Sequence, residues 1–333
     1  MWVYLTPIVC TGILGALGRM WCGLREDRQC RHLQWLYIGI GCVHLISSLL
    51  IASLFSRQTE QWLVPLYLHL ESEQLHQMSV PVALYTVIFG VVCGLGHLIS
   101  ATWRPRVLQQ YIERGNNLYR WCEYALSSSL MVVVIGCLCG INNLYVITGI
   151  AVVQCYTMLQ SHTIEQQWTD VYFTHAESWN AGAYAFGTTV CVYLVGVWVP
   201  IWGYFYPTLS RSSAPDWVYS MVWILFGLFA LFPGIMVYYL VITAHSSTAS
   251  NLKTRHMVKQ ELAYVSLSLI SKLTLQWILY MGIHNQANTH ASNNPNIALI
   301  ASIVGIIGCI IYSAGRVYIL RVYPHTPQNQ FLF

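Results

Sequence analysis

Long apolar runs dominate the hydrophobic pattern of this chain, and charged residues fall mostly between them. A helix that crosses a bilayer needs about 20 mainly apolar residues. The runs that meet this requirement are residues 33–54, 80–101, 118–138, 144–160, 181–206, 218–244 and 257–283. The pattern therefore predicts an all-α membrane protein built on a bundle of seven transmembrane helices.

Two further apolar segments flank these seven. Residues 298–315 carry no charge and have a small residue at every fourth position, which favours close helix packing, so we expect an extra C-terminal transmembrane helix. Residues 2–18 are shorter and contain Pro7, and a short span, an interfacial helix and an uncleaved leader all stay open. The predicted organisation is an apolar N-terminal extension (1–30), the seven-helix bundle (31–285) and the extra helix with a short tail (286–333).

The composition agrees with a membrane protein. Hydrophobic residues make up 56% of the chain and charged residues 8%, whereas about 25% charged residues is usual in soluble domains. The net charge of +4 is small and falls in loops, which argues against a nucleic-acid partner. The 11 cysteines lie mostly inside apolar runs and have no metal-ligand spacing, so we interpret them as packing residues and expect no metal site.

Basic residues cluster in alternate connections, which predicts the orientation. The basic clusters before the first span, in the second connection and in the sixth are Arg25, Arg28, Arg31; Arg104, Arg106, Arg114, Arg120; and Lys253, Arg255, Lys259. Cytoplasmic loops carry such an excess, so we expect an integral multi-pass protein whose seven-helix core has its N-terminal side in the cytoplasm. The fourth connection, on the same side, carries Glu165, Asp170 and Glu177 without Lys or Arg, but acidic residues weigh little in this rule.

One lysine and one carboxylate remain inside the predicted spans. Lys272 lies in SLSLISKLTLQW and Glu123 in RWCEYALSSSLM, while the other carboxylates are assigned to loops or span ends. A charge at bilayer depth costs at least about 2.5–3.5 kcal/mol on insertion scales. Burial favours the neutral amine, which can condense with a carbonyl, and a protonated imine would need a carboxylate such as Glu123 nearby. A plain interhelical ion pair is the alternative, although such pairs seldom stabilise more than an apolar replacement does.

Other polar and aromatic residues in the spans are candidates for the same site. Ser127 lies one turn after Glu123, and Ser268 lies one turn before Lys272, although either serine can instead bond to its own helix. His44 and His97 indicate either a hydrated pocket that holds protons or ordinary interhelical hydrogen bonds. The aromatic side chains that could line a flat conjugated ligand, or simply pack, are Phe226, Phe229, Phe232 and Trp277.

Three stretches resemble the corresponding helices of heliorhodopsins, which are retinal-binding rhodopsins with inverted orientation. They are RWCEYALSSSLM (120–131), LCGINN (138–143) and ELAYVSLSLISKLTLQW (261–277), and the resemblance covers residues 31–285. It implies all-trans retinal bound to Lys272 as a protonated Schiff base, with Glu123 as its counterion.

The resemblance also implies roles for further residues. His44 and His97 would be the two histidines of a cytoplasmic-side cavity, and Ser268 would be a neighbour of the Schiff base. The implied pocket residues are Met131, Gln154, Phe226, Phe229 and Trp277, to which we add Ser127 from its spacing. Family members are typically homodimers with slow photocycles. The chain departs from the family pattern at both ends, at Gln154, where a shorter or longer amide is common, and at Cys93, where a small hydroxyl residue is common.

Three functions compete. The first is a light-sensing photoreceptor, not an enzyme, with a slow photocycle read by a cytoplasmic signalling partner. The second is light-activated proton transport or conductance. It is disfavoured because Val134 stands eleven residues after Glu123, where an outward pump of the microbial type carries its donor acid. The third is a retinal-free receptor or scaffold, but the long disulfide-bearing loop expected of such a receptor is missing from the sequence.

Overall fold

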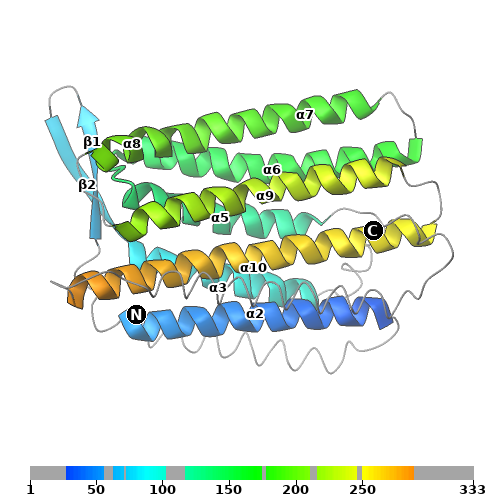
Figure 1. Cartoon of the computed structure of the whole chain (residues 1–333), viewed down its shortest axis with the longest axis horizontal. Coiled ribbons are helices and arrows are strands. Elements are labelled where there is room, and N and C mark those ends of the chain that lie inside the picture. The colour runs from blue at the N-terminus through cyan, green and yellow to red at the C-terminus, as the bar shows by residue number, and fades with distance from the viewer. Residues whose placement is uncertain are drawn as a thin grey trace.

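The computed structural model describes residues 28–55, 63–70, 73–102, 117–174, 178–210, 216–245 and 250–288. Within this part of the chain, long helices lie side by side along one direction, and a hairpin of two strands lies at one end of them (Figure 1). The predicted N-terminal segment over 2–18 and the extra helix over 298–315 lie outside the described residues.

The described elements confirm the all-α bundle and add the hairpin to it. In chain order they are α2 (Arg28–Phe55), β1 (Leu63–Leu70), β2 (Glu73–Pro81), α3 (Val82–Thr102), α5 (Leu118–Leu138), α6 (Leu144–Thr174), α7 (Ser178–Tyr193), η1 (Leu194–Trp198), α8 (Val199–Ser210), α9 (Asp216–His245) and α10 (Ser250–Asn288). Seven described stretches are long and apolar enough to cross a membrane, with α7, η1 and α8 forming one of them. Helices suit this role because their backbone groups are hydrogen-bonded within the segment.

The ends of α5 show how local sequence sets its boundaries. Asn117 precedes the helix, and its side chain accepts a hydrogen bond from the backbone N–H of Arg120 at 3.1 Å. At the other end Gly140 adopts a positive φ of 89°, and Ile141 N–H donates to the carbonyl of Gly136 at 3.0 Å. This is the left-handed glycine stop that the LCGINN stretch provides.

One predicted boundary changes in the structure, and two residues assigned to connections lie inside helices. The predicted fourth span ends at residue 160, but α6 continues to Thr174. Glu165, which the sequence pattern placed in a loop, is therefore part of a helix and is buried. Arg120, also assigned to a connection, lies in the first turn of α5 and is 4% exposed. The loop assignment was wrong for both residues because their mutual pairing allows them to leave water.

The hairpin of β1 and β2 was not anticipated from the sequence. Its antiparallel strands place Leu66 opposite Met78, and Leu66 and Val80 are buried against the bundle. The N–H of Tyr67 donates to the carbonyl of Asn142 at 2.8 Å, which attaches the hairpin to the turn after α5. A two-stranded hairpin alone is marginal, so its docking on the bundle accounts for its formation. We call this end of the bundle the hairpin end.

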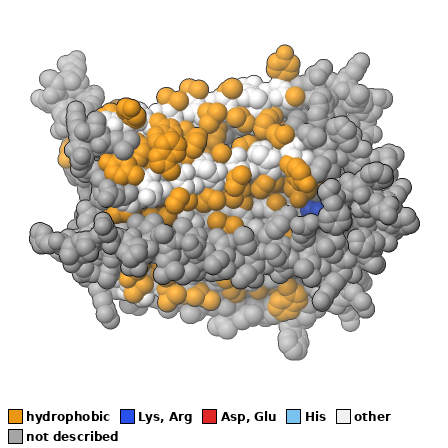
Figure 2. All heavy atoms as spheres, viewed as in Figure 1, with side chains coloured by type: hydrophobic (Ala, Val, Ile, Leu, Met, Phe, Trp, Pro, Cys, Tyr) orange, Lys and Arg blue, Asp and Glu red, His pale blue; other side chains and the backbone are white. Residues whose placement is uncertain are grey.

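The helices differ in how much of their surface the protein covers. Inside α10, 83% of the most apolar stretch is buried, against 22% to 28% in α6, the α7–α8 span and α9. Figure 2 shows that the described side chains visible on one face are nearly all hydrophobic. Lipid can therefore cover α6 to α9, whereas α10 is enclosed by protein, and a charge on α10 is shielded from hydrocarbon.

Candidate functional site

The structure brings Lys272 and Glu123 into direct contact. Nζ of Lys272, on α10, lies 2.6 Å from Oε1 of Glu123, on α5, and the two residues are 3% and 7% exposed. Gly96 on α3 leaves room for the carboxylate, since a Cβ there would lie 2.6 Å from Cγ of Glu123. The ion pair offsets the cost of burying each charge, and losing one partner would leave the other uncompensated.

Two more groups surround this pair. Nζ of Lys272 lies 4.9 Å from the ring centroid of Tyr124, within the range of a cation–π interaction. The buried thiol of Cys93 interacts with both Lys272 and Glu123. Oε2 of Glu123 has no hydrogen-bond partner among the described residues. The carboxylate therefore keeps one oxygen available for a further donor.

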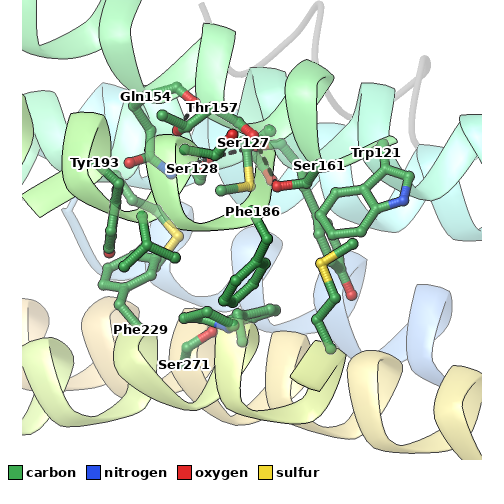
Figure 3. Close-up of a pocket in the computed structure, with 18 of the residues that line it drawn as sticks. Trp121, Ser127, Ser128, Gln154, Thr157, Ser161, Phe186, Tyr193, Phe229 and Ser271 are labelled. Atoms are coloured by element: carbon green, nitrogen blue, oxygen red, sulfur yellow. Dashed lines mark hydrogen bonds between the residues drawn. The ribbon is translucent and has the colours of Figure 1, made fainter. Parts of the chain in front are cut away.

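A cavity with an empty volume of about 700 Å³ adjoins Lys272 (Figure 3). It is lined by α5, α6, α7, α9 and α10. The lining residues are Trp121, Tyr124, Ser127, Ser128, Met131, Gln154, Thr157, Met158, Ser161, Phe186, Thr189, Val190, Tyr193, Phe229, Phe232, Pro233, Met236, Ser271 and Lys272. Its walls are mainly apolar and aromatic, with a few hydroxyl groups, one amide and one amine.

The site residues expected from the sequence fall into two groups. Those that line the cavity are Ser127, Met131, Gln154, Phe229, Phe232 and Lys272. Phe226 instead packs on Trp198, with ring centroids 4.9 Å apart. Trp277 packs on Tyr280 at 5.9 Å. Ser268 is fully buried but is not part of the cavity lining.

The two intramembrane histidines lie together next to the ion pair. The rings of His44, on α2, and His97, on α3, are stacked with centroids 5.8 Å apart. Both side chains are buried, and neither nitrogen of His44 nor Nε2 of His97 has a hydrogen-bond partner in the described part of the chain. The ring of Tyr37 meets His97 edge-on at 5.3 Å. Unpaired nitrogens in this position can accept a proton or hold water.

A second buried charge cluster, which the sequence reasoning missed, lies at the end of the bundle opposite the hairpin. Arg120 donates to Oε1 of Glu165 at 2.5 Å and to Oε2 of Glu261. We call these three residues the Arg120 cluster. With all three groups ionised it carries one net negative charge, and it joins α5, α6 and α10.

Neutral donors complete the coordination of the two carboxylates. Trp121 Nε1 donates to Glu165 at 2.6 Å, and Asn117 Nδ2 donates to Glu261 at 2.7 Å. The hydroxyl of Tyr37, on α2, also donates to Glu261. Buried carboxylates are tolerated when their lone pairs are satisfied in this way.

The spacing of these residues along their helices could have indicated the cluster. Arg120 precedes Glu123 by three residues, and Glu261 precedes Lys272 by eleven, about three turns, so each lies on the same face as a member of the ion pair. The hydropathy pattern assigned Arg120 and Glu165 to loops because such a pattern cannot register that two charges compensate each other.

Within the described membrane spans, the polar groups on the hairpin side of Lys272 are neutral. Gln276, one turn after Lys272, accepts from Ser47 Oγ and donates to Ser48 Oγ, both at 3.2 Å. Its amide also donates to the carbonyl of Thr86 at 3.2 Å. Beyond this network the described core is apolar, with Val134, Leu275, Ile278 and Leu279 buried.

Seven membrane-spanning helices, with a lysine in the last of them paired to a carboxylate in the third, define a rhodopsin of the retinal-binding type. The heliorhodopsin family model matches residues 33–284, and the chain belongs to this family. It is therefore an integral membrane protein of a light-sensing, retinal-binding family and does not belong to a known enzyme family. A comparison with curated proteins gives no match.

The described residues fit a retinal molecule. The cavity lining is mainly apolar and aromatic, as a retinoid hydrocarbon requires. An amine stands in the wall at Lys272, and two buried polar atoms of the lining, Ser127 Oγ and Gln154 Oε1, have no hydrogen-bond partner among the described residues. The residues that would hold the molecule are therefore Lys272 at one end and the α5, α6, α7 and α9 side chains around it.

Removing the guanidinium tests how much the Arg120 cluster contributes to the free energy of unfolding. Arg120→Met removes the guanidinium that contacts both buried carboxylates, Glu165 and Glu261, and we expect a loss of about 3–5 kcal/mol in the free energy of unfolding. Thermal or denaturant unfolding of the purified protein in detergent measures this loss. The matched control is the triple variant Arg120→Met, Glu165→Gln, Glu261→Gln, which should regain much of the stability. Equal stability of Arg120→Met and the wild type would contradict the assignment.

Proposed function

We propose that Lys272 binds all-trans retinal covalently through Nζ as a protonated Schiff base and that Glu123 is its counterion. The observation that carries this proposal is the 2.6 Å contact between Lys272 and Glu123 at the wall of an apolar cavity. The retinal-binding unit is then the seven-helix bundle over residues 31–285. Retinal supplies the absorption of visible light and an isomerisable double bond.

The protein groups around Lys272 neutralise its charge and take up its proton. Glu123 neutralises the positive charge at Nζ and offers Oε2 to a second donor. Ser127 and Ser268 lie one turn from Glu123 and Lys272, within reach of the same region. If the protonated nitrogen at Lys272 released its proton after illumination, Glu123 or the histidine pair His44 and His97 would take it up. Their closeness to the ion pair supports this role.

Polar groups are distributed unequally on the two sides of Lys272, and this favours sensing over transport. Toward the Arg120 cluster the protein offers His97, Tyr37 and Glu261 in succession, joined by the ring contact and the hydrogen bond described above. Toward the hairpin end the described spans contain the Gln276 network and then apolar packing around Val134. A pump needs groups that bind and release protons on both sides, so we propose that the released proton stays on one side.

The proposed output is a slow rearrangement of helices that a signalling partner reads. The Arg120 cluster ties α5 and α10 together at the end opposite the hairpin, and these helices also carry Glu123 and Lys272. A charge shift at the ion pair can therefore alter the packing at that end. We propose that this end faces the cytoplasm, as the basic clusters predict, and that the protein works as a homodimer.

Lysine replacements test the attachment point. The chain has three lysines, Lys253, Lys259 and Lys272. Lys272→Ala should abolish the visible absorption band of protein reconstituted with all-trans retinal, because it removes the amine in the cavity wall. Lys259→Ala, the matched control, should keep it. A visible band in Lys272→Ala, or its absence in the wild type, would overturn the proposal.

Glu123 variants test the counterion. Glu123→Gln removes the negative charge next to Nζ, so the protonated chromophore should absorb at longer wavelength and should persist only at lower pH than in the wild type. Glu123→Asp keeps the charge and should behave closer to the wild type. Absorption spectra recorded across a pH titration measure both effects. A Gln variant with unchanged colour and titration would assign the counterion elsewhere.

Electrical recording separates sensing from transport. We expect flash photolysis to show a slow photocycle, while voltage-clamped cells that express the protein show no steady photocurrent, since the described membrane spans carry no carboxylate on the hairpin side of Lys272. A sustained light-driven current that Lys272→Ala eliminates would establish proton transport instead.

A further inference from the structure

The cavity beside Lys272 contains a hydrogen-bond acceptor that a hydrocarbon ring cannot satisfy. Gln154 lines the cavity, is 0% exposed, and its Oε1 has no partner among the described residues. A buried acceptor without a donor is destabilising, because it has lost its hydrogen bonds to water and has gained no hydrogen bond within the protein. The ligand is the component that can still supply the donor.

The hydrogen bonds of Ser128 fix which end of the Gln154 amide is free. Ser128 Oγ donates its single proton to the carbonyl of Tyr124 at 2.5 Å, so it can only accept from Gln154. Nε2 of Gln154 donates to it at 3.0 Å. The reversed amide would place two acceptors in contact, and Oε1 is therefore the unpaired atom.

Three other hydroxyl groups of the lining donate to backbone carbonyls of their own helices, while Ser127 Oγ, on α5, has no hydrogen-bond partner among the described residues. Thr157 donates to the carbonyl of Gln154 at 2.9 Å, Ser161 to that of Thr157 at 2.8 Å, and Thr189 to that of Ala185 at 2.8 Å. None of them donates to Oε1 of Gln154. The described part of the chain therefore leaves this acceptor open.

Gln154 also lies far from the attachment point across the cavity. Gln154 is on α6, which packs on α5 and α7, whereas Lys272 is on α10, which packs on α9, α2 and α3. Figure 3 shows Gln154 with Ser128 and Thr157 on one side of the cavity and Ser271, next to Lys272, on the opposite side. A long aldehyde attached at Lys272 would extend across the cavity toward the helices opposite α10, of which α6 is one. In a retinoid the far end is the ring.

We propose that this pocket prefers a retinoid aldehyde whose ring carries a hydroxyl group, which donates a hydrogen bond to Oε1 of Gln154. The inference rests on the proposed attachment at Lys272 and adds the chemical class of the preferred chromophore. Unsubstituted retinal also fits, but it leaves the acceptor unpaired or dependent on a trapped water.

A competition experiment on the full chain tests the preference. The protein is expressed without retinoid and incubated with an equimolar mixture of all-trans retinal and its 3-hydroxy analogue, and the bound retinoids are extracted and quantified by chromatography. The wild type should be enriched in the hydroxylated form by about three- to tenfold, the effect of one buried hydrogen bond. Gln154→Leu should bind the two equally. Thr188→Val, which loses a hydroxyl bound to the carbonyl of Tyr184 on the exposed face of α7, outside the cavity lining, should keep the wild-type ratio.

Each other outcome has a definite meaning. Equal binding by the wild type overturns the inference, as expected if water satisfies Oε1. Enrichment that persists in Gln154→Leu, or in Gln154→Met if the Leu variant does not fold, assigns the selectivity to another group and also overturns it. If the wild type binds neither retinoid, the proposed attachment at Lys272 fails instead, and the two failures are thereby distinguished.

Discussion

An ammonium group inside a bilayer is costly unless a carboxylate touches it, and the contact between Lys272 and Glu123 imposes this condition on the whole bundle. It requires α10 to be enclosed by other helices, and 83% of its most apolar stretch is buried. It requires α5 to face α10, and it requires α3 to present Gly96, where a side chain would displace Glu123. The cavity beside Lys272 exists within this arrangement.

The same two helices carry a second set of compensated charges. Arg120 precedes Glu123 on α5, and Glu261 precedes Lys272 on α10, so the two helices share ion pairs at two levels of the bundle. Tyr124 and Tyr264 connect the two levels: Tyr124 lies 4.9 Å from Nζ of Lys272 and donates to the carbonyl of Tyr264, whose ring lies 4.4 Å from the Arg120 guanidinium. Direct contacts therefore connect the Lys272–Glu123 pair to the Arg120 cluster, so a change of charge at one can alter the interactions of the other.

The two halves of the bundle differ in what they can do with a proton. The half that ends at the Arg120 cluster contains titratable side chains in a connected series, including His97 and Tyr37. The described half toward the hairpin contains an amide network around Gln276 and close apolar packing. Amide and hydrocarbon groups neither bind nor release protons near neutral pH, so an asymmetric bundle of this kind suits a receptor that holds its proton inside.

Much of the fold follows from local sequence, because the bilayer makes hydropathy a direct guide to spanning helices. All seven spans were predictable, and the resemblance of three stretches indicated the family that the match over residues 33–284 then showed. The roles of Lys272 and Glu123 could be hypothesised because intramembrane charges are rare enough to stand out.

The tertiary structure decided the features that depend on helix rotation and on distant partners. Glu165 enters a helix only because Arg120 compensates it, and the hairpin forms only where it can dock on the turn after α5. Helix rotation directs Phe229 into the cavity while Phe226, three residues earlier, packs on Trp198. The sequence by itself determined which segments cross the membrane and which charges they carry, since both depend on local composition. Only the packing of the helices determined which of those groups meet, because contacts depend on the tilt and register that neighbouring helices impose.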